Sequence, residues 1–233
     1  MEPAARRERG RSAGAPPRYR TAWSRTLPAR VAREVLLTGV LGPLVWWLGH
    51  PQVRGKANLV DLAPPVVFAA NHASHADTPT LLRSLPARWR RRTVVVAAAD
   101  YFYKDPLRAA AVSLAFGTIP VERDGVTEAS AARMHRLLAR GWNLLLYPEG
   151  TRSRDGRLGP LHRGAAVLAS APRLPLVPIG LAGTHQVLPP GASIPRRHPV
   201  TVRIGAPLTP PFDDVDTLTK RLADALRELS GEL

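Results

Sequence analysis

Short apolar runs alternate along the chain with longer segments in which apolar residues recur at helical spacing. The runs are bounded by turn residues and rich in residues favoured in strands, so they predict strands. The predicted strands cover residues 66–70, 93–99, 118–121, 143–147, 176–179 and 200–204. The helical spacing predicts helices at residues 79–85, 106–116, 128–140, 163–171 and 215–229. This alternation predicts an α/β fold in which helices cover a sheet.

The segment before the first strand, residues 20–50, is amphipathic to apolar and carries almost no charge over residues 35–48. Because a bilayer span takes about 20 apolar residues, this stretch is too short to cross a membrane. Gly42-Pro43 interrupts it, which predicts two short helices with a bend. Trp46 and Trp47 suit a headgroup interface, and three arginines before them suit anionic lipid: Arg25, Arg30 and Arg33. We predict an interfacial helix pair; the alternative is a hairpin packed on the protein's own core.

The length of 233 residues fits one α/β domain with small appendages. Residues 1–19 are rich in arginine, proline and small residues and predict a disordered basic tail. Residues 51–233 are then the globular domain. The chain has no cysteine, which excludes disulfides, thiolate metal sites and a cysteine nucleophile.

The formal net charge of +15 suits nucleic acid, an anionic membrane surface or acidic substrates. Compositional drift toward arginine is the alternative explanation for part of this excess. No basic stripe interleaved with aromatic residues and no zinc-finger spacing occurs in the chain. We therefore predict no nucleic-acid partner and an anionic membrane surface instead.

Two segments carry the candidate chemistry, residues 71–77 and 147–153. The first offers His72 and Asp77 after a predicted strand, in the kind of loop where open α/β sheets bind ligands. A neutral imidazole can take a proton from a hydroxyl, and a carboxylate can fix its tautomer. The second segment offers Arg152 and a glycine turn that can hold a phosphate or an oxyanion. Acylation of an alcohol needs both kinds of site.

Four ordered blocks in this chain resemble those of the glycerolipid acyltransferases, typified by bacterial 1-acyl-glycerol-3-phosphate acyltransferase. The block Asn-His-x-Ser-x-x-Asp is matched by Asn71, His72, Ser74 and Asp77. The block Gly-x-Ile-x-x-x-Arg is matched by Gly117, Ile119 and Arg123. The block Phe-Pro-Glu-Gly-Thr-Arg-Ser is matched at residues 148–153, with Tyr147 in place of the phenylalanine. A Val-Pro-Ile element is matched at residues 177–179.

The resemblance implies a single glycerolphosphate-acyltransferase-like domain with a central mixed sheet flanked by helices. It implies that His72, oriented by Asp77, deprotonates the free hydroxyl of a lysophospholipid, most simply 1-acyl-sn-glycerol-3-phosphate, as that hydroxyl attacks an acyl thioester. Acyl-CoA or acyl carrier protein is the implied donor, with no other cofactor and no metal. The implied substrate-binding residues are Arg123, Glu149, Gly150, Thr151 and Arg152. We expect a peripheral protein on the cytoplasmic face of the cell membrane.

Several of these residues have a simpler structural explanation. Asp77 could cap the helix that follows, alone or in a capping box with Ser74. Glu149 could pair with Arg152 or Arg154 to shape its loop. His75 is treated as peripheral to the base, and the basic cluster at residues 88–92 as a solvated loop or a lipid-facing patch.

Three other functions stay open on the sequence alone. The same chemistry could act on another acceptor, such as an acyl amino acid or a glycosyl lipid, because Glu122, His75 and residues 161–164 depart from the usual pattern. A hydrolase could use a His-Asp pair, but no Gly-x-Ser-x-Gly nucleophile elbow is present. A non-enzymatic membrane adaptor would explain the charge and leave the four blocks unexplained.

Overall fold

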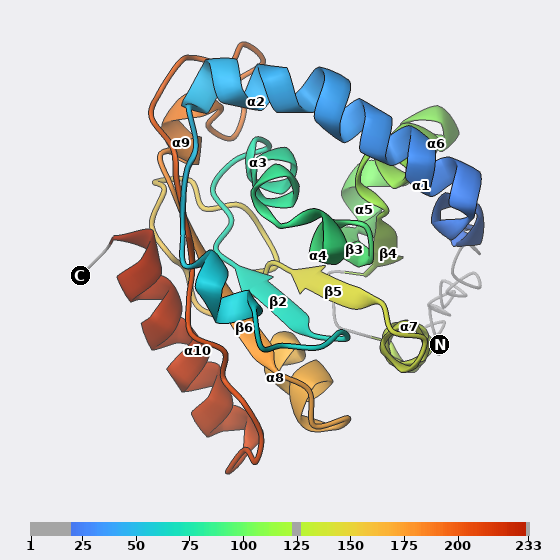
Figure 1. Ribbon diagram of the computed structural model, residues 1–233, viewed down its shortest axis with the longest axis vertical. Coiled ribbons are helices and arrows are strands. Elements are labelled where there is room, and N and C mark those ends of the chain that lie inside the picture. The colour runs from blue at the N-terminus through green and yellow to red at the C-terminus, as the bar shows by residue number, and fades with distance from the viewer. Residues whose placement is uncertain (1–19, 123–126, 232–233) are drawn as a thin grey trace, which may run out of the picture.

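The computed structural model describes residues 20–122 and 127–231, and within them the chain forms a seven-stranded sheet covered by helices (Figure 1). The strands are β1 (Gln52–Arg54), β2 (Val67–Ala70), β3 (Thr93–Ala98), β4 (Ile119–Val121), β5 (Asn143–Leu146), β6 (Leu176–Ala182) and β7 (Thr201–Ile204). Their order in the sheet is β1-β7-β6-β2-β5-β3-β4. Only the pairing of β6 with β7 is antiparallel among the described strands, so the predicted mixed sheet is confirmed.

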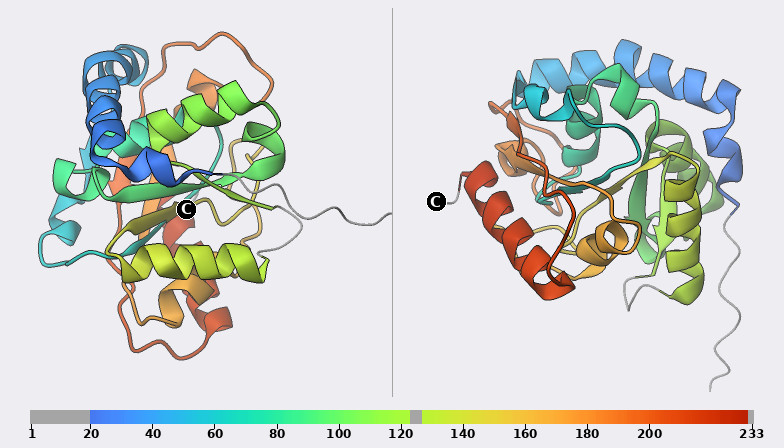
Figure 2. Two further views of the ribbon diagram at one scale, coloured as in Figure 1. Left: turned by 90° about the vertical axis from the view of Figure 1, so that its right-hand side faces the viewer. Right: turned by 60° about the horizontal axis from the view of Figure 1, so that its bottom comes forward.

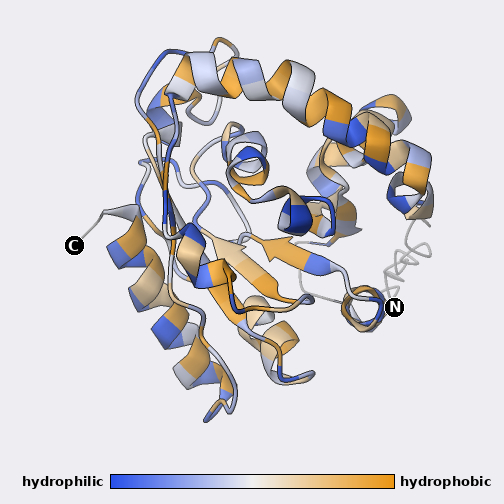
Figure 3. Cartoon of the chain, in the orientation of Figure 1, coloured by the Kyte–Doolittle hydropathy of each residue, from blue (hydrophilic) through white to orange (hydrophobic). Residues whose placement is uncertain are grey.

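The central strands β2 and β5 are buried along their whole length, and they are drawn as hydrophobic in Figure 3. Val67 pairs with Leu144 of β5 on one side and with Leu176 of β6 on the other. A strand covered on both faces takes mostly apolar side chains, which is why these runs lack alternation. The buried exception is Asn143 of β5, which accepts a hydrogen bond from Val66 N and donates one to Trp89 O. The short edge strand β1 was not predicted, because only Val53 in it is even partly buried.

Helices cover both faces of the sheet, as the two views of Figure 2 show. They are η1 (Ala22–Arg25), α1 (Leu27–Val35), η2 (Leu36–Leu41), α2 (Gly42–Gly49), η3 (Lys56–Leu59), α3 (Asp77–Ser84), α4 (Ala87–Arg90), α5 (Ala99–Phe102), α6 (Pro106–Phe116), α7 (Glu128–Ala139), α8 (Gly164–Ser170), α9 (Thr184–Val187) and α10 (Val215–Ser230). One core cluster joins the sheet to α3, α4 and the N-terminal helix, and a second joins it to α7, α8 and α10. The five predicted helices correspond to α3, α6, α7, α8 and α10.

The N-terminal segment is one continuous helix from Leu27 to Gly49, and the prediction of two helices with a bend was wrong. Pro43 lies in the first turn of α2, and the π-helical turn η2 precedes it, so the proline does not end the helix. The helix has 23 residues and is long and apolar enough to cross a membrane by length and composition alone, contrary to the prediction that it is too short. Only 22% of its most apolar stretch is buried.

The π-helical turn keeps one face of this helix on the protein. Ala29, Arg33 and Leu37 are buried at steps of one α-helical turn, and the next buried position, Gly42, comes one residue later than that spacing. The extra residue lies within η2, where the wider turn accommodates it. Without this extra residue, the buried positions of the helix after η2 would turn away from α3.

Arg33 attaches this helix to α6, so its predicted role in binding anionic lipid was wrong. Its guanidinium donates from Nε to Leu114 O at 2.8 Å and from Nη2 to Ser113 O at 3.0 Å. The side chain is buried, and this burial lowers the pKa of Arg33 to about 10, helped by Arg25 and Arg30. The alternative of packing on the protein's own core is therefore realised along one face.

The basic cluster at residues 88–92 is solvated in part, because Arg88, Arg91 and Arg92 are exposed; that it faces lipid stays a prediction. Arg90 is buried and pairs with Glu34 of α1, with 3.2 Å between its Nε and the Glu34 Oε2. Arg88 donates to the carbonyl of Leu59 at 2.5 Å. The predicted basic tail at residues 1–19 lies outside the described residues.

Candidate active site

His72 and Asp77 are brought into contact by the loop between β2 and α3. The Asp77 carboxylate oxygen Oδ2 lies 2.8 Å from His72 Nδ1 and accepts hydrogen bonds from the backbone amides of Ala73 and Ser74, each at 2.8 Å. Asp77 is fully buried, whereas the His72 side chain keeps 19% of its surface exposed. A carboxylate accepting from Nδ1 selects the tautomer in which Nε2 is free to accept a proton.

Asp77 is not the N-cap of α3, but the contact expected of a capping box, from the Ser74 amide to the Asp77 carboxylate, is present. The N-cap of α3 is Ala76, and neither it nor Asp77 forms a side-chain cap to the helix. Instead the Asp77 carboxylate reaches back to the amide of Ser74, while the Ser74 hydroxyl accepts from the Ala76 amide at 3.0 Å and donates to Leu188 O at 2.8 Å. The carboxylate thus organises the loop that carries the histidine and binds the imidazole at the same time.

Asn71 attaches the same loop to the sheet. Its side-chain amide donates to Leu181 O at 2.9 Å, and its carbonyl oxygen accepts from Leu181 N at 2.7 Å. Both partners are in β6, the strand beside β2. The family block includes this asparagine, but sequence reasoning assigned it no role, because the neighbour of β2 in the sheet was unknown.

Glu149 holds the backbone of His72 and forms no ion pair within the described part of the chain, so the predicted pairing with Arg152 or Arg154 was wrong. Its Oε1 accepts from His72 N at 2.7 Å, and its Oε2 accepts from Gly159 N at 2.9 Å. On the other side of the histidine, Ser153 N donates to His72 O at 2.7 Å. Burial raises the pKa of Glu149, and the two amide hydrogen bonds oppose that rise. The loops after β2 and β5 are therefore locked together at the histidine.

The Gly150 turn directs Arg152 toward the same space. Gly150 has φ 70°, and a Cβ built there would lie 3.1 Å from the ring of His162, so the turn requires glycine. The Arg152 guanidinium lies over the Tyr101 ring, 5.2 Å from its centroid, and its Nη1 is buried without a hydrogen-bond partner among the described residues. Thr151 lies on the same turn and lines the cavity. The other predicted phosphate-binding arginine, Arg123, lies outside the described residues.

His75 was treated as peripheral, but it forms part of the cavity wall. Its Nε2 lies 2.9 Å from the Tyr101 hydroxyl. Burial first, and then the charges of Arg152, His72 and Arg108, lower the pKa of His75 to about 4. No carboxylate within the described part of the chain orients this ring, so it differs from His72.

A cavity of about 820 Å³ adjoins these groups. His72, His75, Glu149 and Arg152 line one part of it. Apolar side chains from β3, α6, α7, β5 and α8 line another part: Val95, Phe116, Met134, Leu146 and Leu168. Sequence reasoning missed this lining, since it comes from elements far apart in the chain. In residues 20–122 and 127–231, no three His, Asp or Glu side chains are grouped so that they could hold a metal ion.

The comparisons with known proteins agree with this arrangement. The acyltransferase family profile matches residues 50–182. A chloroplastic 1-acyl-sn-glycerol-3-phosphate acyltransferase, BAT2 of Brassica napus, is 34% identical over 142 residues, which are 60% of this chain and 39% of that protein. The 1-acyl-sn-glycerol-3-phosphate acyltransferase of Limnanthes douglasii is 32% identical over 193 residues, which are 79% of this chain and 66% of that protein.

A solved structure shares the fold. It is the crystal structure of the 1-acyl-sn-glycerophosphate acyltransferase PlsC from Thermotoga maritima, with a TM-score of 0.70, 20% sequence identity and coverage of 91% of this chain and 87% of that chain. The chain therefore shares the α/β fold of that protein. The chain belongs to the acyltransferase family, so the predicted family is confirmed, while its bacterial type stays a prediction.

Proposed function

We propose that this protein transfers an acyl group from an acyl thioester to the free hydroxyl of 1-acyl-sn-glycerol-3-phosphate, giving phosphatidic acid. The observation that carries the proposal is the contact between His72 Nδ1 and the buried Asp77 on the wall of a partly apolar cavity. The names of the relatives support the choice of acceptor. No resident cofactor is part of the proposal, and the donor is acyl-CoA or acyl carrier protein.

The reaction is a single direct transfer. His72 Nε2 accepts the hydroxyl proton as the hydroxyl oxygen attacks the thioester carbonyl, and Asp77 stabilises the imidazolium that forms. The tetrahedral intermediate then collapses, the carbon–sulfur bond breaks, and the thiolate takes the proton from His72. Because the chain has no cysteine, no acyl-cysteine intermediate forms.

In this proposal, arginines bind the phosphate of the acceptor and apolar side chains bind an acyl chain. Arg152, whose Nη1 has no protein partner among the described residues, holds the acceptor phosphate together with Arg123. The Gly150-Thr151 turn shapes the pocket, and Glu149 holds this turn against the backbone of His72. The apolar part of the cavity takes an acyl chain.

The test is a product analysis with each thioester donor supplied separately. Purified protein, 1-acyl-sn-glycerol-3-phosphate and acyl-CoA or acyl carrier protein thioester are incubated, and lipid products are identified by mass spectrometry. We expect phosphatidic acid from the wild type and none above background from His72→Ala. Activity on an acyl amino acid but on no lysophospholipid would favour the other acceptor class, and inactivity on every acceptor would favour the membrane adaptor.

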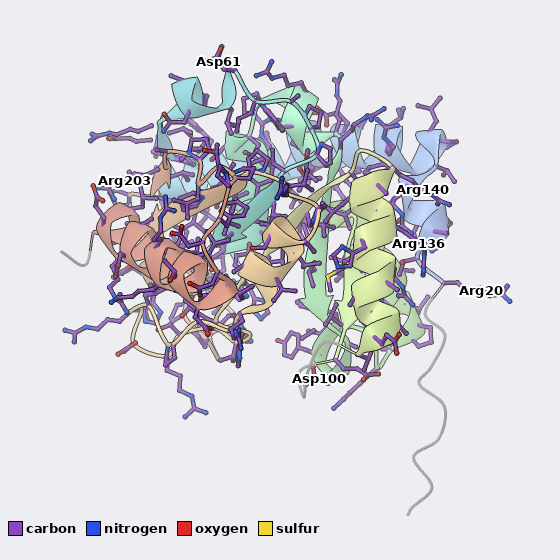
Figure 4. All side chains as sticks on the ribbon, turned by 90° about the horizontal axis from the view of Figure 1, so that it is seen from below. Arg20, Asp61, Asp100, Arg136, Arg140 and Arg203 are labelled. Carbon is purple, nitrogen blue, oxygen red and sulfur yellow. The ribbon has the colours of Figure 1, made fainter. Side chains whose placement is uncertain are left out.

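We further propose that the N-terminal helix lies in the membrane interface on the cytoplasmic side. The face turned away from the protein exposes Leu27, Val31, Val35, Trp46 and Trp47. Arg20, Arg136 and Arg140 appear on the same side of the molecule in the view of Figure 4, a suitable flank for anionic lipid. Spanning the bilayer would detach Arg33 from α6.

Binding to anionic vesicles tests this attachment. Val35 is 63% exposed on the helix, and Val60 is 61% exposed beside η3, so Val35→Ser and Val60→Ser form a matched pair. We expect Trp46→Ala/Trp47→Ala to weaken co-sedimentation most, Val35→Ser to weaken it less and Val60→Ser to leave it unchanged. Binding should fall as salt rises. Protein that resists salt, carbonate and urea extraction would contradict the interfacial position.

A further inference from the structure

The imidazole of His72 is held from a second side by Tyr147. The two rings are stacked, with centroids 4.0 Å apart and an angle of 18° between their planes. The Tyr147 hydroxyl lies 2.9 Å from Thr78 Oγ1. Thr78 follows Asp77 in the first turn of α3, so the stacking ring is bonded to the turn that carries the orienting carboxylate.

The hydroxyl of Tyr147 is a departure from the family block, which has phenylalanine at this position. A buried phenol needs a hydrogen-bond partner, and Thr78 supplies it. Burial, with a smaller contribution from Asp77, raises the pKa of Tyr147 far above its usual value, so the phenol stays neutral. Tyr147 and Thr78 are therefore joined by a hydrogen bond between two neutral hydroxyl groups.

The stacked ring supplies what the carboxylate alone does not. A single hydrogen bond at Nδ1 fixes one edge of the imidazole but lets the ring tilt about that bond. A flat neighbour at 4.0 Å restricts the tilt and so fixes the direction of the Nε2 lone pair. The face of an aromatic ring also attracts a cation, so it favours the imidazolium that forms during the transfer.

We propose that Tyr147, anchored by Thr78, is a positioning residue for His72 that fixes the plane of the imidazole and stabilises its protonated form. The proposal rests on the proposed function of His72 as the base. The other titratable and charged groups near the imidazole are Asp77, His75, Glu149 and Arg152. The variants below leave all four in place.

A double-mutant cycle tests the anchor. Tyr147→Phe and Thr78→Val each remove one partner of the hydrogen bond and keep the shape of the side chain. We expect each to lower kcat by about 3- to 10-fold, and the double variant to be no slower than the slower single variant, because one interaction is lost in all three. Ser84→Ala, which removes another hydroxyl from α3, should keep wild-type kcat.

The pH profile tests the stacked ring. Tyr147→Leu keeps the site apolar but removes the π face, so the acidic limb of the kcat/KM profile should move to lower pH by about half a unit. Tyr147→Phe retains the ring and should leave that limb in place. A merely structural role would change the melting temperature without moving the limb.

The two levels of the proposal fail in different ways. The role of Tyr147 would be overturned if the kcat losses of the two single variants multiplied in the double variant. It would also be overturned if the acidic limb of the pH profile stayed in place in folded Tyr147→Leu. Either result would leave the proposed function standing. Activity retained by folded His72→Ala would overturn the role of His72 as the base, and inactivity of the wild type on every acceptor would overturn the proposed function itself. Circular dichroism and thermal unfolding of each variant identify those that fold.

Discussion

The catalytic loops and the N-terminal helix are attached to the same sheet in different ways. The loops after β2 and β5 are held on several sides by short hydrogen bonds that backbone amides donate to the buried carboxylates of Asp77 and Glu149. The helix is held along one face by Arg33 and Glu34, and its other face is open to solvent. A site that aligns reacting atoms needs constraint from every side, whereas a segment that meets lipid needs one free face.

Removing the base should have the largest effect on the catalytic side of this comparison. We expect His72→Ala to lower kcat by about 10²- to 10⁴-fold with little change in folding, because positioned general-base catalysis contributes that much. Asp77→Asn should also cost heavily through the wrong tautomer. His75→Ala is the control and should lose less than about 10-fold, measured by steady-state kinetics on detergent-dispersed acceptor. A deficit in His75→Ala as large as in His72→Ala would contradict the assignment.

Among variants of the N-terminal helix, removing Arg33 should have the largest effect on stability. Arg33→Met leaves the carbonyls of Ser24 and Leu114 without their guanidinium donor, and we expect a loss of about 2 to 4 kcal/mol in unfolding free energy. Arg30→Met, on the same helix, should cost less than about 1 kcal/mol because the Arg30 guanidinium stacks on Trp142 and forms no hydrogen bond within the described residues. Urea denaturation compares them, and equal losses would show that Arg33 is no special attachment. For the same reason, deletion of residues 1–50 should unfold the domain.

Two glycines in the helix sharpen the comparison between its faces. A Cβ at Gly42 would lie 2.7 Å from Arg83 Nε and 2.9 Å from Leu37 O, whereas a Cβ at Gly39 would meet nothing within 4 Å. We expect Gly42→Ala to destabilise the protein by about 1 to 2 kcal/mol. Gly39→Ala should stabilise it by up to about 1 kcal/mol through helix propensity. Thermal unfolding measures both, and the same sign in both variants would contradict the packing described.

The smallest predicted effect is a pH dependence that comes from the cavity wall. The folded pKa of His75, about 4, is below its ordinary value of 6.5, so the unfolded chain binds more protons between these values. Stability from this residue is present above pH 6.5 and is lost as the pH falls toward 4. His75→Gln should therefore lose less unfolding free energy than the wild type between pH 7 and pH 5. Urea titrations of both proteins at pH 7 and pH 5 measure this. An equal loss of unfolding free energy in the wild type and in His75→Gln would contradict it.

Prediction from the sequence succeeded where the pattern is local. The strands β2, β3 and β5 and the helices α6, α7 and α10 were predicted to within about two residues, because their apolar spacing reports burial directly. It failed at the N-terminal helix, where the glycine-proline pair was given more weight than the π-helical turn that accommodates it. It also failed at Glu149, whose partners are backbone amides and not the nearby arginines.

The sequence by itself determined the fold class, the family and the pairing of His72 with Asp77, which are only five residues apart and meet across one loop. The tertiary structure decided that Glu149 binds the amide of His72, 77 residues away, and that Tyr147 stacks on its ring. It also decided which helices line the cavity and that Arg33 is buried. The physical reason is that these contacts depend on β2 lying between β5 and β6, and strand order in a sheet leaves no mark in local spacing.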